Sequence, residues 1–169
     1  PFDVKLCEQG RNFSNKIWNA FRLTQGWEIS KDKVQPEAAS VGIAWMESRV
    51  NESLAELDEA FETFKLSEAL VKTYRLVWDD FCSWYLELVK PTYGEPCDLK
   101  TFDATTALFE KILKLLHPFA PFISEEIWQW IEERKGPEEA LCLAKWPTSG
   151  EVNAALVKEF DVFKTIVSE

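Results

Sequence analysis

Several features that other classes of protein need are scarce or absent in this sequence. Its 169 residues contain one His, one Met and six Gly, and no glycine stands in a phosphate-cradling or dinucleotide-binding pattern. No apolar run reaches the roughly 18 residues of a membrane span. The chain opens on Pro1 and Phe2, without a methionine or a basic, signal-like segment. We therefore expect a cytoplasmic segment of a longer protein that is not inserted in a membrane.

The cysteines and the histidine do not match a zinc site. Cys7, Cys82, Cys97 and Cys142 include no Cys-x-x-Cys pair, and His117 is the single imidazole. We expect four reduced thiols, with disulfides or metal binding as the lesser alternatives. His117 stands just before a proline at a predicted helix end, where an imidazole more often caps carbonyl groups or packs than acts as a base.

No set of residues predicts catalysis by this chain. The adjacent carboxylates Asp79 and Asp80 would point about 100° apart on a helix, so they cannot share one catalytic pocket. We expect at least one of them to pair with Arg75 or with a neighbouring helix. A nucleophile beside a base is not found elsewhere, and we predict that the chain alone is not an enzyme.

The charge is unevenly distributed. The net charge of −10 argues against a general nucleic-acid binder, which usually has a basic footprint. Residues 1–24, however, hold four basic residues against Asp3 and Glu8, so the rest of the chain is more acidic than the whole. RNA could then bind only along this first segment.

Apolar periodicity predicts an all-α fold, a bundle of about five helices over residues 1–147. The predicted helices cover residues 3–24, 43–64, 67–90, 101–117 and about 124–131. Asp3, Ser67 and Ser124 are the expected N-caps. Residues 141–147 are expected to be extended. Residues 148–169 are expected to be a linker and, from Val152, the start of a helix that is cut off at Glu169.

The predicted core follows from stripes of apolar residues. The helix at 67–90 has two stripes, which places it between neighbours at the centre of the bundle. The first stripe consists of Leu66, Leu70, Val77, Phe81, Trp84 and Leu88, and the second of Tyr74, Trp78, Cys82 and Tyr85. The helix at 43–64 has a single stripe, formed by Ile43, Met46, Val50, Leu54, Leu57, Phe61 and Phe64. Its opposite side, between Glu47 and Glu62, is acidic and typical of a solvated face.

The first helix has a polar half that suggests RNA recognition. At about 100° per residue, one half collects apolar side chains. These are Phe2, Leu6, Phe13, Ile17, Ala20 and Phe21. The polar half contains three asparagines, which are poor helix formers but can read base edges, and interleaved Lys and Arg, which can hold phosphates. A plain polar helix face is the alternative interpretation.

Three stretches resemble one protein family. Residues 10–22 (Gly-Arg-Asn-Phe-Ser-Asn-Lys-Ile-Trp-Asn-Ala-Phe-Arg) closely resemble the opening helix of the anticodon-binding domain of bacterial valyl-tRNA synthetases. Residues 78–90 and 115–128 resemble the central helix and the fourth-to-fifth helix junction of that domain. The last stretch is shared more loosely with the isoleucyl and leucyl enzymes. The tail at 152–169 resembles the approach to the family's C-terminal coiled-coil arm.

The resemblance implies that this segment grips the anticodon loop of tRNA(Val). The catalytic domain of the same chain, which uses ATP and Mg, would lie elsewhere, and the segment itself would need no cofactor and would be monomeric. The residues expected to bind the loop are Arg11, Asn12, Asn15, Lys16, Asn19, Arg22 and Leu23. By position in the motif, Lys16, Asn19 and Leu23 would contribute to reading the second and third anticodon letters, A and C. Lys5 is an expected phosphate contact.

One position departs from the family pattern. The family often has an aromatic residue directly after the arginine of this motif, where a base can stack, and Leu23 stands there in this sequence. Leu23 falls on the polar half of the helix, so it can support a base by apolar contact or simply be an exposed leucine. The acidic helix at residues 47–62 is expected to face away from the RNA. A helical protein-docking module, or the same domain of an isoleucyl or leucyl enzyme, remain the alternatives.

Overall fold

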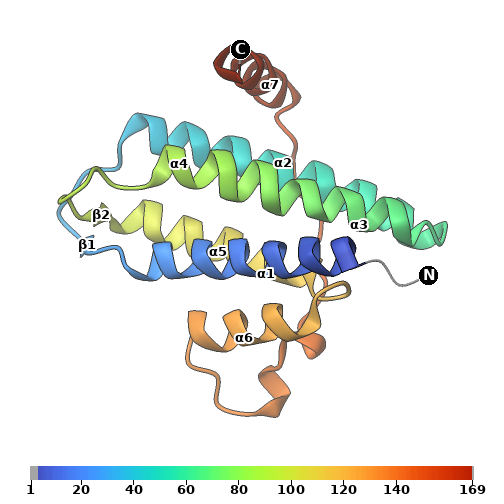
Figure 1. Cartoon of the computed structure of the whole chain (residues 1–169). Coiled ribbons are helices and arrows are strands. Elements are labelled where there is room, and N and C mark those ends of the chain that lie inside the picture. Colours follow the sequence, from blue (N-terminus) through green and yellow to red (C-terminus); the bar gives the residue numbers. More distant parts are fainter. Residues whose placement is uncertain (1–3, 169) are drawn as a thin grey trace.

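Long helices lying side by side make up most of the computed structural model, which describes residues 4–168 (Figure 1). The helices are α1 (Val4–Gln25), α2 (Glu37–Glu62), α3 (Leu66–Arg75), η1 (Leu76–Tyr85), α4 (Leu86–Val89), α5 (Leu99–Leu116), α6 (Pro121–Ile131) and α7 (Ala154–Ser168). The short elements are β1 (Ile29–Ser30), β2 (Cys97–Asp98), η2 (Pro137–Glu139) and η3 (Leu141–Leu143). The predicted all-α class is confirmed. The expected roles of Phe2 and Asp3, and the chain end at Glu169, lie outside the described residues.

The central helix covers nearly the predicted residues, 66–89, but it is less regular than predicted. α3, η1 and α4 form one continuous helix, because Arg75, Leu76, Tyr85 and Leu86 all have right-handed helical backbone angles. Its middle part, η1, has the wider turns of a π-helix, a form that is rare and often found at functional sites. Side chains of η1 contact α5, where Phe81 packs edge-on against Phe109, and its backbone packs against α1 and α2. The predicted central position is confirmed.

The turn between α2 and α3 overturns two predictions. Ser67 is not an N-cap, because Phe64 adopts a left-handed conformation with φ of 57° and the chain re-enters helical geometry at Leu66. The predicted core residues Phe64, Leu66 and Leu70 are 87%, 57% and 48% exposed. They lie at the tip of the α2–α3 hairpin, which extends beyond the helices packed against it (Figure 1).

The core otherwise follows the predicted stripes. Ile43, Met46, Val50, Leu54 and Leu57 of α2 are buried, as are Val77, Phe81 and Tyr85 of the central helix. Trp78, Cys82, Trp84 and Leu88 are partly buried, and Tyr74, also predicted in a stripe, is 40% exposed. The described residues of the first two turns of α1 are all exposed, including Leu6, which was predicted to be buried and is 63% exposed. Trp45 lies outside the predicted stripe but is fully buried.

A two-residue parallel sheet joins two loops that the sequence did not connect. Ile29 pairs with Cys97 and Ser30 with Asp98. Asp98 then caps α5, because its carboxylate accepts a hydrogen bond of 2.9 Å from the backbone N–H of Thr101. This pairing fixes the end of α1 beside the start of α5.

The junction between α5 and α6 corrects the predicted cap at Ser124. α6 begins at Pro121, a residue suited to the first turn because it lacks a backbone N–H. Ser124 therefore lies inside the helix, fully buried, and its hydroxyl bonds the carbonyl of Ala120 at 2.8 Å. His117 packs here, with Nδ1 2.8 Å from the Ser124 hydroxyl.

The C-terminal part also differs from the prediction. The segment predicted to be extended at 141–147 begins instead with the 3-10 turn η3 at residues 141–143, because the N–H groups of Leu143 and Ala144 bond back to Ala140 and Leu141. Ala144, which follows it, is extended. After a linker, α7 packs on α2, with Phe160 stacked on Trp45 at 4.0 Å between ring centroids.

None of the helices in residues 4–168 has the length and apolarity that a bilayer span requires.

Candidate nucleic-acid interface

The exposed side of α1 carries the residues predicted to bind RNA. Phe13, Ile17, Ala20, Phe21 and Thr24 are buried against the bundle and fix the rotation of the helix. The opposite side, which we call the α1 polar face, consists of the exposed residues Arg11, Asn12, Asn15, Asn19, Arg22 and Leu23. These six of the predicted residues therefore lie on one continuous, solvent-facing strip.

The polar side chains of the α1 polar face bond to no other side chain of residues 4–168. Within residues 4–168, no side-chain hydrogen bond or ion pair engages Arg11, Asn12, Asn15, Asn19 or Arg22. Three unbonded asparagines on one helix face are unfavourable for helix stability, since Asn has a low helix propensity. Their amides and the two guanidinium groups are free to meet an outside partner that offers both acceptors and donors.

Lys16 is oriented differently from the other predicted residues. Its ammonium donates a hydrogen bond of 2.8 Å to the Ser83 hydroxyl and lies 4.2 Å from the centroid of the Trp78 ring. Both partners belong to η1. Lys16 is half-buried at the border between the α1 polar face and the central helix.

The surroundings of Lys16 are aromatic and largely apolar. Trp78 stacks on Tyr74 at 5.5 Å, and Phe13 stacks on Tyr74 at 5.3 Å. Burial raises the pKa of the neighbouring Cys82 thiol to about 12, although the Lys16 charge acts in the opposite direction. Cys82 is therefore a neutral thiol at physiological pH and does not compete for the Lys16 ammonium.

Leu23 and Lys5 occupy the two ends of the helix. Leu23 is 43% exposed, in agreement with its predicted place on the polar half. Lys5 is exposed in the first turns of α1. The two residues are separated by five turns of α1 at about 3.6 residues per turn, so a single small ligand could not touch both.

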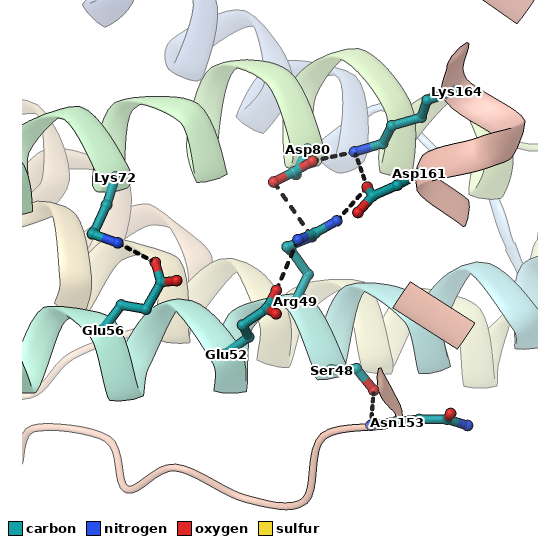
Figure 2. A network of polar contacts seen from close by, with 9 residues as sticks. All are labelled: Ser48, Arg49, Glu52, Glu56, Lys72, Asp80, Asn153, Asp161 and Lys164. Carbon is teal, nitrogen blue, oxygen red and sulfur yellow. Dashed lines mark hydrogen bonds and ion pairs between the residues drawn. The ribbon is translucent and has the colours of Figure 1, made fainter. Parts of the chain in front are cut away.

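The acidic residues of α2 lie beyond the central helix. η1 packs against α1 on one side and α2 on another. Glu52 and Glu56 of α2 pair with Arg49 at 2.8 Å and Lys72 at 2.5 Å, which offsets part of their charge (Figure 2). This arrangement agrees with the expectation that the acidic helix faces away from a ligand on α1.

The carboxylate Asp80 has a structural role. Asp80 pairs with Arg49 of α2 at 3.8 Å and with Lys164 of α7, whereas Asp161 of α7 lies 2.5 Å from Arg49 (Figure 2). The predicted pairing with a neighbouring helix is confirmed, and Arg75 is not the partner. These ion pairs join α2, η1 and α7.

The depression of the described surface between α2 and residues 118–146 is less suited to a polyanion. This depression, of about 510 Å³, is lined by Asp58, Phe61, Glu62, Pro118 and Trp146, and its two carboxylates would repel a phosphate. Among the described residues, no group of His, Cys, Asp and Glu could hold a metal ion. The α1 polar face is therefore the best candidate for a polyanionic ligand.

Sequence reasoning missed two residues of this surface. It placed Trp78 in an apolar stripe and gave Ser83 no role, but both anchor Lys16. The sequence does mark Ser83, because it is a polar residue between the two apolar stripes of the central helix and a polar residue there needs a partner. The partner could not be inferred, because 67 residues separate Ser83 from Lys16.

Comparison with known proteins gives one consistent family. The family model described as the anticodon-binding domain of tRNA ligase matches residues 44–169, which begins after α1. The valine–tRNA ligase of Christiangramia forsetii is 54% identical over 159 residues, 94% of this chain and 18% of that protein. That of Parabacteroides distasonis is 48% identical over 167 residues, 99% of this chain and 19% of that protein, so the match includes α1. A more distant relative, the valine–tRNA ligase of Rhizobium meliloti, is 36% identical over 94% of this chain and 17% of that protein. The chain thus spans less than a fifth of the length of the curated relatives it matches.

Proposed function

Because this chain belongs to the family of anticodon-binding domains of tRNA ligases, we propose that it holds the anticodon loop of a valine tRNA for a valine–tRNA ligase. The observation that carries the proposal is the α1 polar face, a strip of amides and guanidinium groups with no partner among the described residues. The assignment to valine is supported by the names of relatives that are 45–54% identical over nearly the whole chain.

The chemistry of the α1 polar face fits an RNA loop. Guanidinium groups bind phosphate oxygens in a bidentate manner, which positions the backbone. Amides offer a donor and an acceptor side by side and can read the edge of an unstacked base. In this proposal, Lys16, Asn19 and Leu23 contribute to reading the second and third letters of the anticodon, A and C, with Arg11, Asn12, Asn15 and Arg22 beside them and Lys5 on a phosphate.

The proposal assigns the chemical reaction to another part of the protein. ATP and Mg would serve the catalytic domain, and this chain would need no cofactor of its own. It would act as a monomer in the cytoplasm. It would orient the tRNA because this chain and the catalytic domain bind the same tRNA together. Binding by this chain alone is then expected to be weak, because the contacts at the acceptor end of the tRNA are missing.

The direct test is binding of this chain to an anticodon stem-loop of valine tRNA at two salt concentrations. A copy with the second anticodon letter changed is the specificity control, and stem-loops of isoleucine and leucine tRNAs test the related enzymes. We expect the valine loop to bind most tightly and its affinity to fall with salt, since phosphate contacts release counterions. Salt-insensitive binding without preference among the loops would instead indicate a protein-docking module.

Two variants distinguish recognition of a base from electrostatic attraction to the phosphates. Asn19→Ala should weaken binding to the valine loop more than binding to the altered loop, because an amide that reads a base contributes only where that base is present. Lys5→Ala should weaken both equally and lower the salt slope. Lys158→Ala, an exposed lysine of α7, serves as the matched charge control and should change neither.

A further inference from the structure

Lys16 differs from a typical surface lysine because its charged end is held in place. The Ser83 hydroxyl accepts one of its hydrogen bonds at 2.8 Å, and the Trp78 ring lies under the ammonium at 4.2 Å. A free lysine loses much side-chain entropy when a ligand fixes it, and it is more flexible than arginine. In this protein that ordering is already present before a ligand arrives.

The two anchors are themselves fixed. The Ser83 hydroxyl donates a hydrogen bond of 2.8 Å to the backbone carbonyl of Trp78, so its oxygen lone pairs point toward Lys16. This bond spans five residues within η1, the separation that a π-helix brings together. Trp78 in turn stacks on Tyr74 and Phe13, which holds its ring face toward α1.

The anchored ammonium keeps hydrogen-bonding capacity. A lysine ammonium has three N–H donors, and Ser83 takes one of them. No carboxylate among the described residues pairs with Lys16, and the nearby Cys82 is a neutral thiol because burial raises its pKa to about 12. No carboxylate of residues 4–168 therefore offsets the charge of Lys16, which stands at the border of the α1 polar face.

We propose that Ser83 and Trp78 are positioning residues that hold the Lys16 ammonium ready for an oxygen acceptor of the bound RNA. The acceptor is a phosphate oxygen or a base carbonyl, both of which accept from an ammonium. This inference rests on the proposed function, because it assumes that RNA occupies the α1 polar face. Lys16 makes the contact, and η1 sets its position.

The test is a double-mutant cycle on RNA binding by the whole 169-residue chain, with the valine anticodon stem-loop as the probe. Lys16→Met should weaken binding by about 10-fold or more, as expected for a hydrogen bond from a charged donor. Ser83→Ala should weaken it about 3- to 10-fold in the wild-type background, the range of a single neutral hydrogen bond. In the Lys16→Met background, Ser83→Ala should have almost no effect, because nothing is left to position.

Control variants separate positioning from folding. Ser67→Ala makes the same substitution on the same continuous helix at an exposed site, and it should leave binding unchanged. Trp78→Leu should act like Ser83→Ala, and Trp78→Phe should restore part of the affinity, since a phenyl face still attracts a cation, though less strongly than indole. Circular dichroism and melting temperature identify any variant that fails to fold.

The salt slope and the loop preference identify the acceptor. If Lys16 meets a phosphate, Lys16→Met lowers the salt slope by about one and weakens all loops alike. If it meets a base carbonyl, the variant reduces the preference for the valine loop over the altered loop. Equal losses from Ser83→Ala in both Lys16 backgrounds would overturn the positioning role while leaving the proposed function intact. Failure of the wild-type chain to bind any loop, at RNA concentrations high enough for the weak binding expected of this chain alone, would reject the proposed function, and the positioning role with it.

Discussion

Removing the Asp80 carboxylate should loosen α7 from the bundle. Asp80 is 14% exposed and lies between Arg49 and Lys164, which are 17% and 18% exposed (Figure 2). Asp80→Ala leaves the two cations with Asp161 as their shared carboxylate, 2.5 Å from Arg49 and 3.9 Å from Lys164. Arg49 also keeps Glu52 at 2.8 Å.

The magnitude follows from burial and from the remaining partners. Removing one partner of a fully buried ion pair costs about 3–5 kcal/mol, because the other charge is left uncompensated. Since these side chains retain some exposure and Asp161 remains, we expect Asp80→Ala to lower the free energy of unfolding by about 2–3 kcal/mol. Glu52→Ala removes a more exposed carboxylate, 39% exposed, from the same arginine. It should cost less than about 1 kcal/mol and is the matched control.

Urea unfolding measures the loss of stability in Asp80→Ala and in the Glu52→Ala control, and a cycle of four proteins tests whether the loss depends on Lys164. The wild type, Asp80→Ala, Lys164→Met and the double variant form a cycle in which coupled residues give a non-additive sum. We expect the Asp80→Ala loss to fall by more than half in the Lys164→Met background. A loss no larger than that of Glu52→Ala, or one that is the same in both backgrounds, would refute the idea that Asp80 fixes α7.

Three further outcomes are expected. Under an excess of iodoacetamide near neutral pH, Cys7 and Cys142, which are exposed, should be alkylated well before the buried Cys97 and the half-buried Cys82, and peptide mass spectrometry measures the order. Burial raises the pKa of Cys82 from 9.0 to about 12, so only the unfolded chain ionises this thiol at intermediate pH. The contribution of Cys82 to stability should therefore be complete below pH 9 and lost as the pH rises toward 12, and Cys82→Ala should reduce this alkaline loss in urea titrations. Leu23→Phe should strengthen binding of the valine loop about fivefold or more, as expected for a stacked base, and unchanged affinity would remove residue 23 from the binding surface.

The helices were predictable because each is amphipathic over several turns. Buried stripes such as Met46, Val50 and Leu54 depend on local periodicity, which a sequence displays directly. The errors fall where periodicity gives no information. Leu66 and Leu70 have core spacing, but they lie at a hairpin tip with no helix opposite. The pairing of Ile29 with Cys97 involves only two residues per strand, which is too short to leave a pattern.

The candidate site was predictable to the same extent. The α1 polar face follows from the helical wheel, since its members need only solvent on one side. The anchoring of Lys16 does not, because it depends on the register between α1 and η1 and on a π-helical turn that brings Ser83 to the carbonyl of Trp78. α7 shows the same limit. Its helix was predicted, but its stacking of Phe160 on Trp45 joins residues more than a hundred positions apart.

The distribution of charge explains how a chain with a net charge of −10 can offer a surface to RNA. At physiological salt the charge of an exposed group is screened beyond about 8 Å, so an approaching phosphate responds to the nearest residues and not to the sum. Glu52 of α2, Asp161 of α7 and Asp80 of the central helix have their carboxylates engaged with Arg49 and Lys164 (Figure 2). The α1 polar face, in contrast, exposes two guanidinium groups that pair with no carboxylate of residues 4–168. The same central helix therefore does two things: it fixes the ion pairs on one side through Asp80, and on the other side it holds the Lys16 ammonium at the edge of the face that RNA would meet.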